Sequence, residues 1–160
     1  MTKEYLSKQA QFSHCRRYRY WLGREWNQGI GTVLFIGLNP STADHVQDDP
    51  TIRRCVRFAR SWGYRRMEIV NLFAFRATLP EDLKAATNPV GPANDRWIRK
   101  AEKSADIIIA CWGNQGSFLE RDSEILEILG SLHCIQLNKS KIPAHPLYLK
   151  ANLQPQPLPA

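Results

Sequence analysis

Four short apolar runs, rich in β-branched residues, constrain the fold of this 160-residue chain more than any other feature. They cover residues 32–36, 67–73 and 106–111, with a shorter run at 133–137. Runs of this length and composition are typical of buried parallel strands. Segments with helical spacing separate them, so we expect an α/β protein: a three-layer sandwich around a mostly parallel, four-stranded central sheet.

Turn-forming and capping residues indicate where the intervening helices begin and end. Asp49 suits an N-cap and Pro50 the first helical position. Gly63 suits the left-handed residue that closes that helix. Two further helices are expected over residues 94–103 and 117–129.

The two ends of the chain carry weaker signals. Alternating residues in the segment 14–27 predict a strand at an edge of the sheet. We expect a single α/β domain over residues 1–150. The proline-rich tail, residues 151–160, is expected to be extended and poorly packed, because proline continues neither a helix nor a strand ladder.

Composition places the chain among globular, non-membrane proteins. No apolar run approaches the roughly 18 residues that a membrane-spanning helix needs. The four cysteines are scattered and form no CxxC pair, and the chain begins with no export signal. We therefore expect a reduced, cytoplasmic protein without membrane contact; its oligomeric state is not indicated.

Basic charge is clustered, within a net charge of +7. Arg53, Arg57 and Arg60 recur at helical spacing and form one stripe. A second cluster, at residues 16–24, interleaves four arginines with aromatic residues. Basic and aromatic side chains together suit phosphates and stacked bases, so the expected partner is nucleic acid, DNA ahead of RNA, or a nucleotide. The alternative is a solvated basic face.

Polar residues follow each predicted strand. Asn39, Asn71 and Asn114 follow the first three, and His145 lies beyond the fourth. Ligands of open α/β sheets bind outside the carboxyl ends of the strands, so these four side chains are expected to line one cleft.

Amides and an imidazole define the chemistry expected there. An amide can orient water or pair with the edge of a base, and a neutral histidine can donate to developing negative charge. Alternatively, Asn39 and Asn71 tie down loop backbone, Ser41 caps a turn, and His145 is structural. Asp49 is already explained as a cap, and the sequence contains none of the common nucleotide, zinc or serine-hydrolase motifs, so no metal or cofactor is expected.

Three segments in this order resemble a bacterial family of unknown function: LNPSTAD at 38–44, NLFAFR at 71–76 and HPLYL at 145–149. The resemblance covers most of the chain, from about residue 15 to residue 149. It brings no activity with it.

The same segments resemble the uracil-DNA glycosylase superfamily. The string Gly37-Leu38-Asn39-Pro40 is similar to the motif that positions the hydrolytic water in that superfamily, and Asn71 matches the residue that reads the base. Trp112-Gly113 matches the end of its third strand, and His145-Pro146 matches the start of its last motif. Leu147-Tyr148 replaces the usual Ser-Pro, and Ser41–Asp49 is acidic where a pocket aromatic is usual.

This resemblance implies a base-excising N-glycosidase in which Asn39 and His145 are catalytic. The residues expected to bind the substrate are Asn71, Pro40, Ser41, Trp112, Asn114 and Tyr148. Those expected to contact nucleic acid are Arg53, Arg57, Arg60, Arg76 and Lys141. Two alternatives stay open. One is a module of the same fold that binds a base or nucleotide without cleaving it, and the other is an enzyme acting on a small phosphorylated metabolite.

Overall fold

A single mixed sheet organises the computed structural model, which describes residues 4–159. Within that range the sheet has seven strands. In spatial order they are β1 (Ser7–Phe12), β2 (Arg19–Glu25), β4 (Arg66–Asn71), β3 (Thr32–Gly37), β5 (Ile107–Ala110), β6 (His133–Cys134) and β7 (Gln156–Pro157). Strands β4, β3, β5 and β6 are parallel, whereas β1, β2 and β7 pair antiparallel with their neighbours.

The α/β class and the parallel strands are confirmed, but the predicted size of the sheet is wrong. The four predicted strands form its parallel centre, and three antiparallel strands extend it at both sides. The predicted edge strand of residues 14–27 is β2, which lies inside the sheet between β1 and β4. The polar strand β1 covers that edge, and its sequence SKQAQF carries no apolar run.

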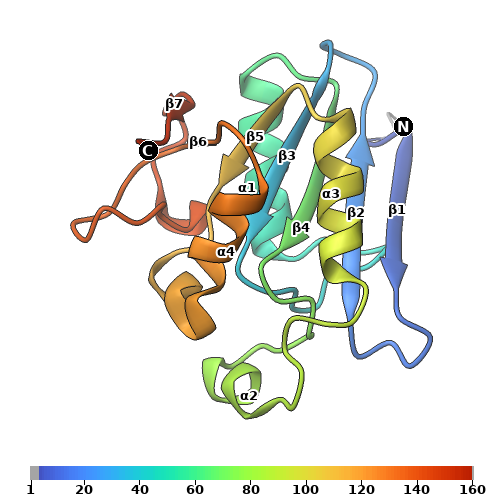
Figure 1. Ribbon diagram of the computed structural model, residues 1–160. Coiled ribbons are helices and arrows are strands. Elements are labelled where there is room, and N and C mark those ends of the chain that lie inside the picture. The colour runs from blue at the N-terminus through green and yellow to red at the C-terminus, as the bar shows by residue number, and fades with distance from the viewer. Residues whose placement is uncertain (1–3, 160) are drawn as a thin grey trace.

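Helices cover both faces of the sheet (Figure 1). On one face, α1 (Pro50–Ser61) packs against Val33, Phe35 and their neighbours. On the other, α3 (Asn94–Ser104) and α4 (Arg121–Ile128) pack around Leu34 and Ile36. Alternate residues of β3 therefore contribute to opposite cores, as expected for a strand buried on both faces.

Helix α1 begins and ends as predicted. Asp49 is its N-cap, with Oδ1 accepting a hydrogen bond from the backbone N–H of Ile52 at 2.9 Å. The chain leaves the helix through Gly63, whose φ of +86° is the left-handed conformation that favours glycine. A short helix that was not predicted from the sequence, α2 (Pro80–Ala85), lies below the strand ends in Figure 1.

The predicted helix over residues 117–129 is interrupted. A 3₁₀ segment, η1 (Asn114–Glu120), precedes α4, and its last two residues, Leu119 and Glu120, have φ of +55° and +53°. Arg121 explains the break, because its buried guanidinium donates from Nε to the carbonyl of Leu72 at 2.8 Å and forms salt bridges with Asp95 and Glu124. These tertiary contacts override the local helical preference.

The proline-rich tail contributes to the sheet, contrary to the expectation of an unpaired end. Strand β7 pairs with β6, and the N–H of Leu158 donates to the carbonyl of Leu132 at 2.9 Å. Pro157 is tolerated because β7 is an edge strand.

The four cysteines are free thiols. No helix of the described residues is long and apolar enough to cross a membrane.

Candidate functional site

A small, partly open pocket of about 50 Å³ lies where β3 and β4 end. We call it the inner pocket. It is lined by Arg19, Gly37, Asn39, Pro40, Ser41, Asp49, Thr51, Ile52, Ile69, Asn71, Cys111, His145 and Pro146. The structure thus brings together Asn39, Asn71 and His145, three of the four side chains that the strand-end rule predicted to converge.

Asn71, the last residue of β4, projects an unused amide into this pocket. Its side chain is buried, and Nδ2 has no hydrogen-bond partner among the described residues. A Cβ at Gly37, the last residue of β3, would lie 2.7 Å from Asn71 Oδ1, so glycine makes room for the amide there. A buried amide donor without a partner destabilises the folded state, so such a donor is expected where a ligand supplies the acceptor.

Asn39 has a mixed role. Its Nδ2 donates to the carbonyls of Ala77 at 2.7 Å and Pro40 at 3.1 Å, which is the loop-anchoring role considered in the sequence analysis. Those bonds fix the orientation of the amide. Oδ1 then remains as the acceptor that can orient a water molecule.

His145 is held in one tautomer. It caps the short 3₁₀ segment η2 (Pro146–Tyr148), with Nδ1 accepting from the N–H of Leu147 at 3.2 Å. The proton of the neutral ring is therefore on Nε2, which makes that atom a donor. Burial lowers the pKa of His145 below its ordinary value of 6.5, partly opposed by the Asp49 carboxylate, so the ring is neutral at pH 7.

The inner pocket also contains Arg19 and Asp49, which were not predicted to belong to the site. Arg19, the first residue of β2, is 2% exposed; its Nη1 donates to the carbonyl of Ala43 at 3.1 Å, while its Nε has no partner among the described residues. Asp49 accepts from the N–H of Ala43 at 3.3 Å with the oxygen that the helix cap leaves free. The basic and aromatic pattern around Arg19 was noticed, but its position depends on how β2 pairs with β4.

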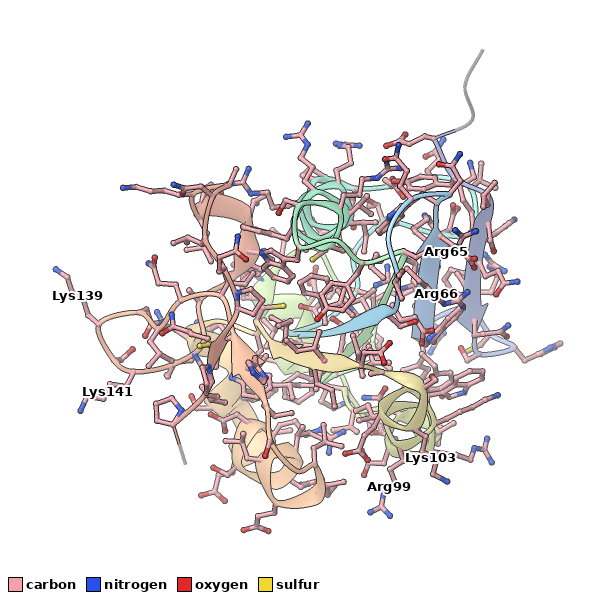
Figure 2. All side chains as sticks on the ribbon, turned by 90° about the horizontal axis from the view of Figure 1, so that it is seen from above. Arg65, Arg66, Arg99, Lys103, Lys139 and Lys141 are labelled. Atoms are coloured by element: carbon pink, nitrogen blue, oxygen red, sulfur yellow. The ribbon has the colours of Figure 1, made fainter. Side chains whose placement is uncertain are left out.

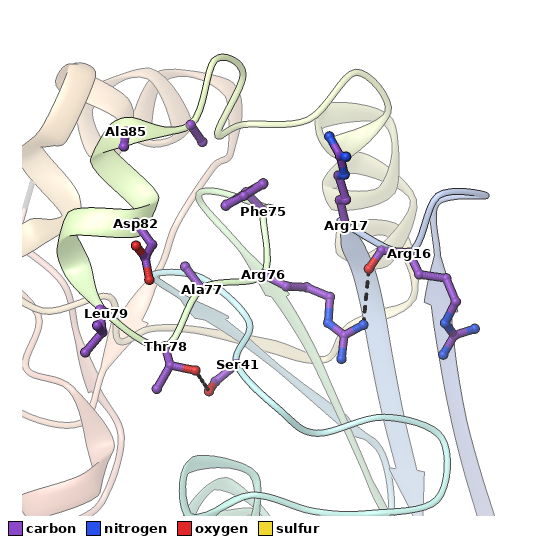
Figure 3. Close-up of a pocket in the computed structure, with 11 residues that line it drawn as sticks. Arg16, Arg17, Ser41, Phe75, Arg76, Ala77, Thr78, Leu79, Asp82 and Ala85 are labelled. Carbon is purple, nitrogen blue, oxygen red and sulfur yellow. Dashed lines mark hydrogen bonds between the residues drawn. The ribbon is translucent and has the colours of Figure 1, made fainter.

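An open groove of about 940 Å³ adjoins the inner pocket (Figure 3). We call it the outer groove. Arg16, Arg17 and Arg76 line it together with Phe75, Ala77, Thr78, Leu79, Asp82, Ala85 and Ala86. Ser41 borders both cavities, and its Oγ lies 3.4 Å from Thr78 Oγ1. Arg76 Nη1 donates to the carbonyl of Arg16 at 3.1 Å, which holds two arginines of the groove together.

Several predicted site residues lie elsewhere. Asn114 does not line the inner pocket; it is exposed and accepts hydrogen bonds from Asn138 and Ser140. Gly113, with φ of +75°, turns the chain into η1 and carries Asn114 away from the strand end. Trp112 is buried in the core beside α3 and α4, and Tyr148, 90% exposed, lines neither cavity.

The predicted phosphate-contacting residues are spread over the surface. Arg53, Arg57 and Arg60 are exposed on α1, but Arg53 Nη1 donates to the carbonyl of Asp48 and Arg60 Nη2 to that of Glu4. Lys141 is also exposed. Figure 2 shows Arg99, Lys103, Lys139 and Lys141 pointing outward. It also labels Arg65 and Arg66, which are half-buried and form salt bridges with Glu25 and Glu68.

The acidic loop before α1 is engaged within the protein. Asp48 forms a salt bridge with buried Arg24 at 2.9 Å. Asp44 accepts from the N–H groups of Gln47 and Val46, and these bonds lower the pKa of its carboxyl. Among residues 4–159 no cluster of three or more histidine, cysteine or acidic side chains has the arrangement of a metal site.

Comparison with protein families gives a match over most of the chain. The family described as "Protein of unknown function (DUF1643)" matches residues 19–147. No curated protein and no solved structure matches the chain. None of these comparisons links the chain to the uracil-DNA glycosylase superfamily, so that resemblance stays a prediction.

Proposed function

We infer that this chain, which belongs to the DUF1643 family of proteins of unknown function, is an N-glycosidase that hydrolyses the bond between base and sugar in nucleic acid or a nucleotide. The observation that carries the proposal is the convergence of Asn39, Asn71 and His145 on one pocket with Asn71 Nδ2 unpartnered. Each has the hydrogen-bonding groups that one step of this chemistry needs.

The reaction divides among these side chains as follows. Asn71 recognises the base edge with its amide, and Asn39 Oδ1 orients the water that attacks C1′ of the sugar. The C1′–N bond breaks, and its electron pair leaves with the base. His145 Nε2–H stabilises the negative charge that develops on the base. The water oxygen remains on C1′, and a water proton ends on the base.

The two cavities suit two parts of one substrate. The inner pocket, at about 50 Å³, takes the edge of a base and not a whole nucleotide. The outer groove, at about 940 Å³, has room for a sugar and phosphates. Its arginines suit phosphate oxygens, because a guanidinium forms paired, charge-assisted hydrogen bonds with them.

The glycosylase-like interpretation of the fold belongs to this proposal. It is supported by the order β4-β3-β5-β6 of the parallel strands and by the strand-end positions of Asn39, Asn71 and Trp112-Gly113. Asn39, Asn71 and His145 line the inner pocket. They are also the residues that the proposal assigns to water activation, base recognition and charge stabilisation.

The test is base release from single- and double-stranded oligonucleotides containing uracil, hypoxanthine or substituted pyrimidines. We expect one base to be excised by the wild type, with rates about 10²–10³-fold lower in Asn39→Ala and His145→Ala. Asn114→Ala is the matched control, because this asparagine lies outside the inner pocket, and it should retain wild-type turnover.

The other outcomes separate the alternatives. Salt-sensitive oligonucleotide binding without an abasic product would favour a binding module over an enzyme. Affinity for a mononucleotide that does not grow with oligonucleotide length would favour a small phosphorylated substrate. Equal turnover in wild type, Asn39→Ala and His145→Ala would refute the catalytic assignment.

A further inference from the structure

Arg19 brings a buried positive charge to the wall of the inner pocket. It is 2% exposed, and of its guanidinium nitrogens Nη1 donates to the carbonyl of Ala43. Nε is buried without a partner, and Arg19 forms no salt bridge with any residue from 4 to 159. A charge removed from water in this way is strongly unfavourable unless an anion compensates it.

The charged groups around Arg19 compensate this charge only in part, through Asp49 and Asp44. Asp49 is the carboxylate with the largest influence on it, but its oxygens accept from the N–H groups of Ile52 and Ala43. Asp44 interacts more weakly and is half-buried. Arg24 and Arg76 add positive charge nearby. Burial lowers the pKa of Arg19 to about 10, so it remains charged at neutral pH.

The backbone adds potential of the same sign. Thr51 and Ile52 line the pocket and belong to the first turn of the 12-residue helix α1; the turn itself holds no acidic residue, and the N-cap Asp49 supplies one carboxylate to this end of the helix. The N-terminal end of a helix favours negative charge because its first N–H groups point outward along the axis.

We propose that the inner pocket is an anion site and that Arg19 binds a negatively charged oxygen of the base. This deepens the proposed function by naming the substrate class: oxo-bases, whose ring oxygens carry the electron pair released from the C1′–N bond. Alkylated bases with a fixed positive charge are excluded, since Arg19 repels them. Arg19 and Asn71 then supply two hydrogen-bond donors to the base beside His145 Nε2–H, and in both of them the base satisfies an atom that has no protein partner.

The test compares two free pyrimidines of similar size at pH 7.5 and constant ionic strength: barbiturate, which is anionic there, and uracil, which is neutral. Calorimetric titration gives both affinities. We expect the wild type to bind barbiturate at least about tenfold more tightly than uracil, and Arg19→Gln to lose that ratio. The ratio is measured within one variant, so a general loss of structure does not imitate the result.

Arg54→Gln is the matched control. Arg54 also has a buried, unpartnered Nε, but it lines a separate groove beside Arg57 and Phe58. This variant should keep the wild-type preference for barbiturate. If Arg19→Gln does not fold, the wild-type comparison still decides the question.

The binding assay tests the anion site and the excision assay tests the N-glycosidase, and the two are independent because binding does not require turnover. Equal affinity for the two probes, tighter binding of uracil, or binding of neither at millimolar concentration overturns the anion site. Base excision without the barbiturate preference leaves the N-glycosidase standing and removes the role of Arg19. A barbiturate preference without excision does the reverse.

Discussion

At the scale of single residues, Gly37 controls the position of the recognition amide. A Cβ there would lie 2.7 Å from Asn71 Oδ1, closer than real Cβ contacts occur, so Gly37→Ala must displace the Asn71 side chain. No hydrogen bond from the described residues holds that side chain in place. We expect base affinity or turnover to fall at least about tenfold, with an overpacking cost of about 1–3 kcal/mol in the free energy of unfolding.

Gly130→Ala provides the comparison for this prediction, because a Cβ at Gly130 meets nothing within 4 Å. Turnover and urea denaturation should both match the wild type. Full activity in Gly37→Ala would show that the position of the Asn71 amide does not matter.

His145 makes stability depend on pH in a defined direction. Burial lowers its pKa in the folded chain. Below about pH 6.5, therefore, His145 of the unfolded chain binds a proton that His145 of the folded chain does not. The free energy of unfolding therefore decreases as pH falls from 7 toward the folded pKa of His145. His145→Asn removes the titrating group and keeps a side-chain acceptor for the N–H of Leu147.

The measurement is urea denaturation of both proteins at pH 7 and pH 5. The wild type should lose more stability on acidification than His145→Asn, since the two proteins differ only at residue 145. An equal loss would mean that the folded chain takes up the proton at the ordinary pKa.

At the scale of elements, α1 and α3 offer two basic surfaces that differ in their relation to the site. Helix α1 begins at the inner pocket and carries Arg53, Arg57 and Arg60; α3, on the other face of the sheet, exposes Arg96, Arg99 and Lys103. If α1 contacts phosphates, replacing its three arginines with glutamine reduces the slope of log affinity against log salt by about 0.9 for each lost contact on duplex DNA.

Replacing Arg96, Arg99 and Lys103 with glutamine makes the same change of net charge. That variant should keep the wild-type slope, measured by fluorescence anisotropy over a range of salt concentrations. Equal reductions in both variants would indicate general electrostatic attraction, and no reduction in the α1 variant would identify its stripe as a solvated face.

At the scale of the whole molecule, the sequence predicts two kinds of feature. These are the strands that follow from local residue pattern, and the side chains that the geometry of a parallel sheet brings together. Apolar runs located the parallel strands, and the strand-end rule brought Asn39, Asn71 and His145 to one pocket. The same rule failed for Asn114, because Gly113 redirects the chain immediately after the strand. Arg19 was missed for another reason: its burial depends on β2 lying between β1 and β4, a pairing of segments far apart in the sequence.

The tail depends on the same kind of distant pairing, and its removal has a measurable cost. Leu158 donates to Leu132, Gln156 Nε2 to the carbonyl of Ile135, and the carbonyl of Leu153 accepts from Trp62 Nε1. At about 1 kcal/mol for each bond, plus the apolar contacts of Leu153 and Leu158, ending the chain after Lys150 should lower the free energy of unfolding by about 2–4 kcal/mol. Ending it after Leu158 keeps all three bonds and should change nothing in urea denaturation. Equal stability of both truncations would show that β7 contributes no net free energy, and that the domain is complete at residue 150.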